Sequence, residues 1–264
     1  MNFNEKVVLI SGATGGMGEE LAKQLSKEGC KLALFARREE KLRELSDKIK
    51  TISNKTECIH MKCDVKKRED VKQVVEFTRN KFGKIDVAIL TAGVLVPNPI
   101  ETFDSSIIID SMETNFFSNI YFIENLLPIM KSQKSGIIAV TSTLPDKRGV
   151  PGWGAYGASK AAVSWLMESL RTEAKRKYNI SFITIKPGSV LTPMIKSYHR
   201  HGAITAEKAA ETIIKGIKKE KKIIQFPFYQ VLPTRFADLL PPIIYDSGIA
   251  EQQRGDGYPV VEEK

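Results

Sequence analysis

Short apolar runs rich in β-branched residues alternate with longer amphipathic stretches along most of this chain. The short runs are typical of buried strands, and the longer stretches repeat their apolar positions with the period of a helix. We predict strands at Lys6–Ile10, Lys31–Ala36, Glu57–His60, Asp86–Thr91, Ile137–Ser142, Ile180–Lys186 and Lys222–Phe226. We predict helices at Gly16–Glu28, Glu39–Lys50, Lys67–Phe82, Ser105–Lys131, Trp153–Lys177 and Ala206–Lys219.

This alternation predicts a Rossmann-type α/β fold, in which a doubly wound parallel sheet of about seven strands lies between two layers of helices. Strands such as Val87–Leu90 are apolar on both faces, as a sheet covered on both sides requires. We find no boundary in the pattern and expect one domain over residues 1–248. Residues 249–264 are polar and are expected to form a loosely held tail.

Composition excludes several classes of protein. With 42% hydrophobic and 27% charged residues, the 264-residue chain is neither disordered nor fibrous. No apolar run approaches the roughly 18–20 residues that span a bilayer. The three cysteines are an odd number without the spacing of metal ligands. We therefore expect a cytoplasmic protein with free thiols and no metal site.

The chain is basic, with 40 Lys and Arg against 31 Asp and Glu, a formal net charge of +9. Such an excess can indicate binding to nucleic acids or anionic membranes. However, most lysines are scattered, and the one cluster lies within Lys215–Lys222. Because no nucleic-acid recognition motif accompanies it, we interpret the charge as solvated surface and expect no nucleic-acid partner.

A glycine-rich turn follows the first predicted strand and leads directly into the first predicted helix. Small residues allow a tight turn, let backbone amides approach a pyrophosphate, and let the helix pack closely on the strand. Its place between a strand and a helix predicts a dinucleotide site. The residues that would form this site are Gly12, Thr14, Gly15, Gly16, Met17 and Gly18.

Basic residues follow the second strand, where an NAD-selective site would carry an acidic residue about 20 positions beyond the glycines. Arg37 occupies that place, Arg38 follows it, and Lys41 lies one helical turn further on. Cations at the start of a helix are unfavourable for the helix dipole, which favours a ligand as their explanation. Because they can bind a 2′-phosphate, we predict NADP(H) as the cofactor.

Tyr156 and Lys160 are spaced i and i+4 and share one face of a predicted helix. A phenol with a pKa of about 10 is a poor acid or base near neutrality, and a nearby ammonium lowers that pKa. The spacing can arise by chance in a lysine-rich chain with seven tyrosines. Its position after the fifth strand, downstream of a phosphate turn, is what indicates a catalytic pair.

These features resemble the short-chain dehydrogenase/reductase family in order and spacing from about residue 5 to residue 226. The resemblance is carried by Ser11-Gly12-x-x-x-Gly16-x-Gly18, Thr91-Ala92-Gly93, Asn115, Tyr156-x-x-x-Lys160 and Pro187-Gly188. It implies hydride transfer at a nicotinamide, a ketone or secondary alcohol as substrate, and a homodimer or homotetramer formed through the helices predicted at Ser105–Lys131 and Trp153–Lys177.

The resemblance also implies roles for individual residues. Tyr156 would be the general acid for ketone reduction or the base for alcohol oxidation, Lys160 would bind the nicotinamide ribose and lower the Tyr156 pKa, and Asn115 would hold a water that relays the proton. The remaining cofactor contacts would come from Asp64 and Val65 beside the adenine, Ala92 and Gly93, and Pro187, Gly188, Val190 and Thr192 beside the nicotinamide.

The chain departs from the family pattern in two places. Leu90 and Thr91 stand where the family usually has two asparagines, a change that affects mainly the support of the strand. The catalytic serine position falls on Thr143, 13 residues before Tyr156, while Ser142 lies one position earlier. A threonine hydroxyl can donate the same hydrogen bond, so we favour Thr143 and keep Ser142 as the alternative.

Two further alternatives are open. If neither hydroxyl reaches the substrate, the protein would be a non-catalytic NADP(H)-binding sensor or scaffold. Residues 223–245 are rich in Phe, Leu, Ile and Pro and follow the lysine cluster. We favour a final strand and a small helix packed between subunits over a membrane-docking surface beside a basic helix face, which would suit a lipid ketone reductase.

Overall fold

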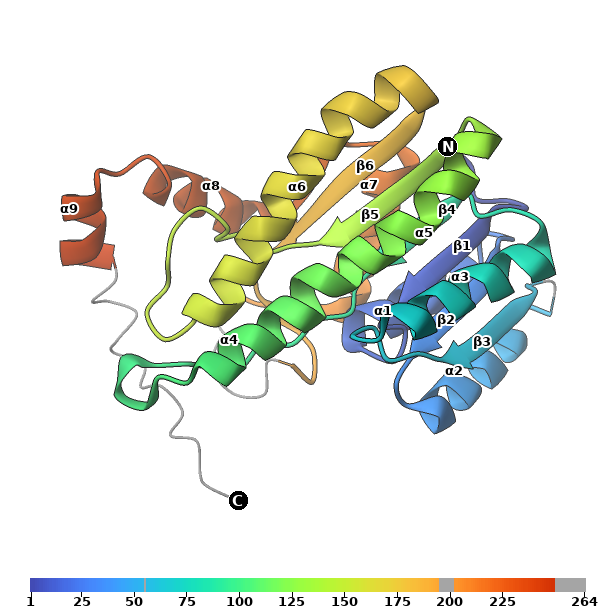
Figure 1. The fold of residues 1–264 in the computed structure, drawn as a ribbon, viewed down its shortest axis with the longest axis horizontal. Helices are drawn as coiled ribbons and strands as arrows, with labels where there is room; N and C mark the ends of the chain where they lie inside the picture. Colours follow the sequence, from blue (N-terminus) through green and yellow to red (C-terminus); the bar gives the residue numbers. More distant parts are fainter. Residues whose placement is uncertain (55, 195–201, 250–264) are drawn as a thin grey trace.

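The computed structural model describes residues 1–54, 56–194 and 202–249 (Figure 1). They form a seven-stranded parallel sheet in the order β3-β2-β1-β4-β5-β6-β9. Its strands are β1 (Val7–Ser11), β2 (Lys31–Ala36), β3 (Cys58–Lys62), β4 (Val87–Leu90), β5 (Gly136–Thr141), β6 (Ile180–Pro187) and β9 (Ile223–Phe226). The predicted doubly wound Rossmann-type sheet is confirmed.

Helices cover both faces of this sheet. Those connecting or flanking its strands are α1 (Gly16–Ser26), α2 (Glu39–Ile52), α3 (Arg68–Phe82), α4 (Ser105–Met112), α5 (Ser118–Gln133), α6 (Gly154–Tyr178) and α7 (Ala206–Lys218). In Figure 1, α3, α5 and α6 lie in front of the sheet, and α1, α2 and α7 lie behind it. A small second sheet pairs β7 (Val190–Leu191) with β8 (Ile204–Thr205).

One hydrophobic core lies on each face of the sheet, between the strands and the helices that cover that face. Because side chains alternate along a strand, each strand contributes residues to both cores. Val8 and Ile10 of β1 belong to the core with α1, α2 and α7. Leu9 points the other way, into the core with α3, α5 and α6. This double burial explains why the strands read as continuous apolar runs. The sheet takes strands from residue 7 to residue 226, and one domain over residues 1–248 stays a prediction.

The helix predicted over Ser105–Lys131 is wrong in one respect. A π-helical turn, η2 (Glu113–Phe117), separates α4 from α5. Such a turn inserts one extra residue into the helix, and it occurs frequently at functional sites. Apolar periodicity did not reveal it, because the chain remains helical on either side. The insertion turns the buried Asn115 side chain toward the loop after β4, with which it forms hydrogen bonds.

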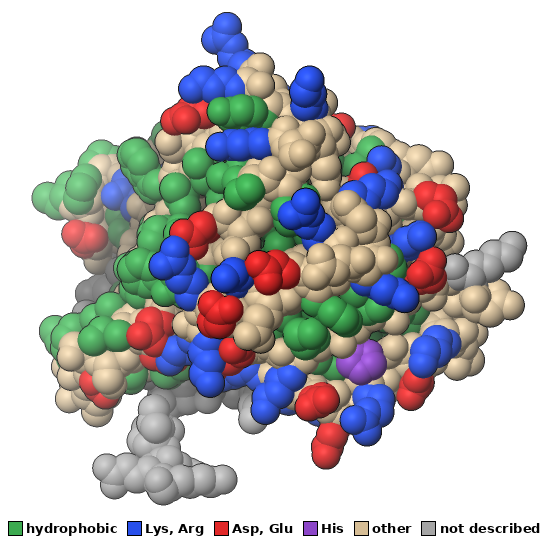
Figure 2. Space-filling model, turned by 45° about the vertical axis from the view of Figure 1, so that its right-hand side comes forward, with side chains coloured by type: hydrophobic (Ala, Val, Ile, Leu, Met, Phe, Trp, Pro, Cys, Tyr) green, Lys and Arg blue, Asp and Glu red, His purple; other side chains and the backbone are tan. Residues whose placement is uncertain are grey.

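The C-terminal segment extends beyond the carboxyl ends of the strands (Figure 1). It contains α8 (Phe228–Ala237), α9 (Pro242–Ile244) and a π-helical turn, η3 (Tyr245–Ile249). Figure 2 shows hydrophobic side chains gathered on this side of the molecule. The exposed apolar side chains of the segment are Phe228, Tyr229, Leu232, Phe236, Leu239, Ile243 and Ile244. The predicted polar tail lies outside the described residues except for Ile249.

The lysine cluster does not adjoin this apolar segment. Its lysines end α7 and precede β9, whereas α8 follows the other end of that strand. Within the cluster, Lys218 pairs with Glu28 at 2.7 Å, and Lys215 pairs with Glu211. The alternative of an apolar surface beside a basic helix face is therefore wrong about the placement of the charge. None of the helices in the described part of the chain combines the length and apolar character that crossing a membrane requires.

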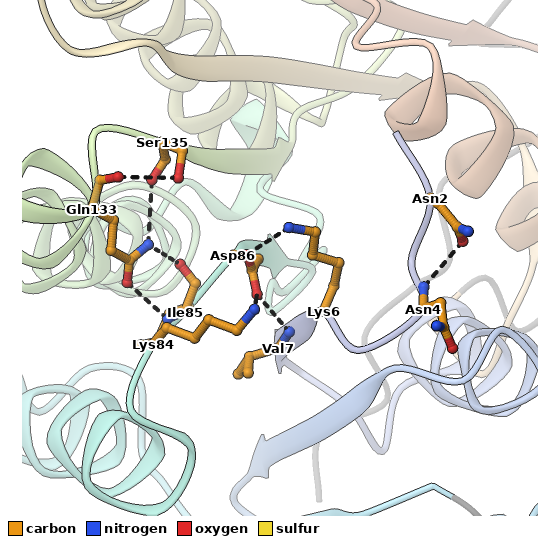
Figure 3. A network of polar contacts seen from close by, with 9 residues as sticks. All are labelled: Asn2, Asn4, Lys6, Val7, Lys84, Ile85, Asp86, Gln133 and Ser135. Atoms are coloured by element: carbon orange, nitrogen blue, oxygen red, sulfur yellow. Dashed lines mark hydrogen bonds and ion pairs between the residues drawn. The ribbon is translucent and has the colours of Figure 1, made fainter.

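A polar network holds the amino ends of β1 and β4 together (Figure 3). Asp86 accepts hydrogen bonds from the Val7 amide at 2.9 Å and from Lys6 at 3.1 Å, and pairs with Lys84 at 3.0 Å. Gln133 binds both the amide and the carbonyl of Ile85. Burial of Asp86 disfavours its charged form, but the Val7 amide and the two lysines outweigh burial and lower its pKa.

We expect Asp86→Asn to lower the free energy of unfolding by about 1–3 kcal/mol at pH 7. Because the folded-state pKa of Asp86 lies below its unfolded value, its stabilising contribution is fully present above the unfolded pKa. It is lost as the pH falls through the folded pKa, so the deficit of the variant should shrink there. Urea unfolding at pH 7 and below pH 4 measures this. Asp47→Asn, on an exposed carboxylate of α2, is the control; an equal loss in both variants would contradict the assignment.

Candidate active site

The glycine turn between β1 and α1 is held tightly against the end of β4. Gly12 has a φ of +70°, and a Cβ at this position would lie 2.7 Å from the Ala92 amide nitrogen. A Cβ on Gly18 would lie 2.3 Å from the Gly12 carbonyl oxygen. Larger residues would therefore push the turn away from the sheet. The helix α1 begins at Gly16, and its first amides have no partners within the helix, as an anion site requires.

A cavity of about 570 Å³ opens over this turn at the carboxyl ends of β1, β2 and β4. Nine predicted cofactor residues line it: Gly12, Thr14, Gly15, Arg37, Arg38, Asp64, Val65, Ala92 and Gly93. The lining residues that sequence reasoning missed are Ala36, Cys63, Lys66, Thr91, Thr114 and Met194. The predicted residues outside the lining are Gly16, Met17, Gly18, Lys41, Tyr156, Lys160, Pro187, Gly188, Val190 and Thr192.

The two arginines after β2 lie at one end of the cavity. Arg37 is exposed there, and Arg38 donates hydrogen bonds from one nitrogen to the Thr14 carbonyl at 2.7 Å and to the Thr14 hydroxyl at 3.2 Å. Arg38 thus joins the positive charge to the glycine turn. Lys41 is exposed on α2 and does not line the cavity, so its part in binding a 2′-phosphate stays a prediction.

Lys66 adds a cation to the wall that no sequence motif signalled. Its ammonium lies 2.7 Å from Asp110 and 2.8 Å from Glu113, which belong to α4 and η2. Hydrogen bonds to these carboxylates raise the Lys66 pKa. The interaction ties the loop after β3 to the start of the helical region that carries Asn115. Because its partners stand more than 40 positions away along the chain, local patterns could not reveal it.

Tyr156 and Lys160 lie in the first turns of α6, as predicted. The Lys160 ammonium is buried, donates a hydrogen bond to the Thr141 carbonyl at 2.7 Å, and lies 5.8 Å from the centre of the Tyr156 ring. Burial lowers the pKa of Lys160 to about 8. Burial also raises the pKa of Tyr156, while a hydrogen bond with Thr143 opposes this shift. The expected lowering of the Tyr156 pKa by Lys160 stays a prediction.

Asn115 joins this pair to the loop after β4. Its side chain accepts a hydrogen bond from the Val94 amide at 2.7 Å and donates to the Val94 carbonyl at 3.0 Å and to Ser159 at 2.9 Å. A Cβ on Gly93 would lie 3.0 Å from the Asn115 side-chain oxygen and 3.4 Å from the Lys160 ammonium. Gly93, which lines the cavity, therefore lies between the cavity and Lys160.

The structure distinguishes between the two hydroxyl residues that follow β5. The Ser142 hydroxyl donates to the Lys160 carbonyl at 2.9 Å and shares a hydrogen bond with the Ser164 hydroxyl at 2.8 Å. It is therefore directed into the packing of α6 rather than toward the phenol. The Thr143 side chain instead faces Tyr156, close enough to oppose the rise of the Tyr156 pKa that burial causes. Ser142 is thus misplaced among the candidate catalytic residues, because adjacent residues at the end of a strand point in opposite directions.

The loop after β6 closes the site from the other side. A Cβ on Gly16 would lie 2.8 Å from the Thr192 methyl, so Thr192 lies against the start of α1. The Gly188 amide donates to the Phe226 carbonyl at 2.7 Å, and the Ser189 amide donates to the Gln230 side chain at 2.8 Å. Gln230, on α8, was not predicted; no local motif distinguishes it.

The loops that follow β4 and β5 also meet. The Asn98 amide in the loop after β4 donates to the Gly152 carbonyl, in the loop after β5, at 2.7 Å. The Asn98 side chain in turn binds the backbone of Asp104 in both directions, at 2.9 and 3.0 Å. Both loops are therefore anchored beside Tyr156.

Comparison with known proteins defines the family. The model of the short chain dehydrogenase family matches residues 6–202. An uncharacterized oxidoreductase of Listeria innocua is 34% identical over 91% of this chain and 90% of its own length. An 11-beta-hydroxysteroid dehydrogenase A of Sesamum indicum is 33% identical over 70% of this chain and 52% of its own length. This chain belongs to the short-chain dehydrogenase/reductase family and is an oxidoreductase.

Solved structures agree on the fold. Levodione reductase superimposes with a TM-score of 0.80 at 24% identity, over 87% of this chain and 99% of that protein. An actinorhodin polyketide ketoreductase, solved with NADPH, superimposes with a TM-score of 0.76 at 24% identity, over 84% of this chain and 94% of that protein.

Proposed function

We propose that this protein is an NADP(H)-dependent oxidoreductase that interconverts a ketone and a secondary alcohol. One observation carries the proposal: a single cavity runs from Arg37 and Arg38 to Gly93, and Gly93 lies against Lys160 beside Tyr156. A 2′-phosphate at the arginines and a reacting carbon near the phenol would thus belong to one bound dinucleotide. Relatives named as hydroxysteroid dehydrogenases support this class of reaction.

The residues of the turn fit such a cofactor. The turn around Gly12 and Gly15 is so close to the sheet that a Cβ on Gly12 would not fit. The amides at the start of α1 would therefore be free to bind a pyrophosphate. Arg37 and Arg38 would hold the 2′-phosphate, with Arg38 already fixed on Thr14. When bound, NADPH supplies the hydride that is added to the carbonyl carbon.

The chain's own groups would handle the proton. Tyr156 donates its phenolic proton to the carbonyl oxygen during reduction and accepts it during oxidation. Thr143, whose side chain faces Tyr156, would donate a second hydrogen bond to that oxygen and polarise the carbonyl. The Lys160 ammonium stabilises the phenolate that remains, because opposite charge nearby favours the ionised form. Asn115 holds the loop at Val94 beside them.

We also propose that the protein forms a homodimer or homotetramer through α5 and α6. Two large apolar side chains stand exposed there: Trp165 on α6 is 79% exposed, and Phe117 in η2, directly before α5, is 43% exposed. Large exposed apolar side chains of this kind are typical of protein contacts.

We expect Arg37→Asp to weaken binding of NADPH about tenfold or more while changing NADH binding little, because the lost cation faces only the 2′-phosphate. Fluorescence titration with both dinucleotides measures the two dissociation constants. Arg43→Asp, an equal charge change on an exposed position of α2, is the control. If Arg37→Asp weakened the binding of NADPH and of NADH equally, the proposed NADP(H) preference would be contradicted.

We expect Tyr156→Phe to lower kcat by about 10²–10⁴-fold, the range for loss of a general acid, while NADPH binding is retained. NADPH oxidation against a panel of ketones, followed by absorbance, measures this. A wild-type protein that binds NADPH and oxidises it with no ketone of the panel would instead favour the sensor or scaffold function.

The two hydroxyls can be separated by substitution. We expect Thr143→Val to lower kcat by about 10²–10³-fold, because it removes the hydrogen-bond donor to the oxyanion at nearly constant volume. Thr143→Ser should retain activity. Ser142→Ala should change kcat little but lower the free energy of unfolding by about 1 kcal/mol. Ser142→Ala losing as much activity as Thr143→Val would contradict the assignment to Thr143.

A further inference from the structure

A buried cluster of charges joins the loop that carries Thr143 to the C-terminal helix α8. Asp146, whose side chain is 1% exposed, pairs with Lys186, which is 8% exposed. Arg235 of α8 lies 3.5 Å from Asp146 and 2.6 Å from Asp238. The cluster holds two carboxylates and two cations and is therefore neutral. None of these four residues lines the cavity or takes part in the proposed chemistry.

The cluster connects the two walls of the active site. Asp146 stands three residues after Thr143, and Lys186 directly precedes Pro187 and Gly188. Beside the ion pair, the Leu144 amide donates to the Pro187 carbonyl at 2.8 Å. The ion pair thus links the loop that presents the Thr143 hydroxyl to the loop expected to face the nicotinamide.

The helix α8 and the residues after it hold the same two loops. Arg148 donates to the backbone carbonyl of Asp238 at 3.3 Å, and the Tyr245 hydroxyl donates to the Gly149 carbonyl at 2.9 Å. Gln230 of α8 accepts from the Ser189 amide at 2.8 Å. A displacement of α8 would therefore move both walls together.

Charge burial on this scale is costly, and stability alone explains it poorly. Both Asp146 oxygens, one nitrogen of Arg235 and one oxygen of Asp238 have no well-aligned hydrogen-bond partner among the described residues. A buried ion pair regains its desolvation cost only with good geometry and further hydrogen bonds, and apolar residues often replace such a pair without loss of stability. Buried ionic groups can instead select one arrangement of the chain.

We propose that Asp146 is a positioning residue. With Lys186 and Arg235 it fixes the loop that sets the Thr143 hydroxyl against Tyr156, and so makes α8 part of the frame of the active site. This inference rests on the proposed function, because it assigns Asp146 an effect on catalysis that acts through Thr143. Arg235, which faces inward from α8, then couples the apolar outer surface of this helix to the active site.

The decisive test is a double-mutant cycle between Asp146→Asn and Thr143→Val, with kcat and KM for ketone reduction as readouts. We expect Asp146→Asn to lower kcat at least tenfold, with KM and the NADPH dissociation constant changed less than about threefold. In the Thr143→Val background, Asp146→Asn should have almost no further effect on kcat, since residues that act through one another are non-additive. Fully additive effects on kcat would overturn the proposal.

Two variants keep the test informative if Asp146→Asn does not fold. Arg235→Gln, at a side chain that is 24% exposed, should give the same selective loss of kcat and the same non-additivity with Thr143→Val. Lys147→Gln, an exposed charge on the same loop, is the matched control and should leave kcat unchanged. Equal kcat values for Arg235→Gln, Lys147→Gln and the wild type would overturn the proposal.

Amide hydrogen exchange separates this proposal from the proposed function. In Asp146→Asn or Arg235→Gln, exchange at residues 143–149 should rise, while residues 137–140 of β5 stay protected; Lys147→Gln should change neither. If the wild-type protein reduces no ketone, the proposed function fails, and with it the catalytic role of Asp146. If the protein is active but hydrogen exchange at residues 143–149 is unchanged in both variants, the proposed function stands and the positioning role of Asp146 is refuted.

Discussion

The structure depends on the contact between the first turn and the end of β4. Gly12, with its left-handed backbone, lies so close to Ala92 that no side chain fits between them, and Gly18 lies equally close to Gly12. This contact brings the start of α1 over the carboxyl ends of the central strands, where the strand order reverses. In a doubly wound sheet this is the place where ligands bind, and the cavity of this protein opens there.

From that contact, the site extends along the sheet through hydrogen bonds rather than through one continuous segment. Gly93 follows β4 and lies at the cavity. The Asn115 side chain binds the backbone of the next residue, Val94. The Lys160 ammonium lies close to Gly93 and donates a hydrogen bond to Thr141 at the end of β5. The π-helical turn η2 is what directs Asn115 toward this point. The turn η2 thus helps to bring the ends of β4 and β5, the helix α6 and the loop after β4 together at the proposed reaction centre.

The C-terminal segment has two different faces. On its inner side, Arg235 pairs with Asp238 and lies beside Asp146, while its outer face exposes Leu232 at 65% and Leu239 at 82%. The inward face supports both loops beside Tyr156. The lysine cluster, at the far end of β9, takes no part in this arrangement.

The sequence by itself determined the sheet and the main parts of the site. Apolar residues on both faces of a strand require a parallel sheet covered on both sides, so the seven strands of the main sheet were predictable. The turn at Gly12 was predictable because a glycine-rich turn between a strand and a helix is typical of a dinucleotide site. The two strands of the small sheet, β7 and β8, were not predicted. Arg37, Arg38 and the Tyr156–Lys160 spacing were also readable, because each lies within one local element. Only the tertiary structure decided that Ser142 turns into the packing of α6 while Thr143 faces Tyr156, that burial raises the Tyr156 pKa, and that Lys66 and Asp146 find their partners. The alternation of side chains along a strand shows that adjacent residues face opposite sides of the sheet, but it does not show which side faces the site. Ion pairs between residues far apart in the sequence form only when the chain has folded.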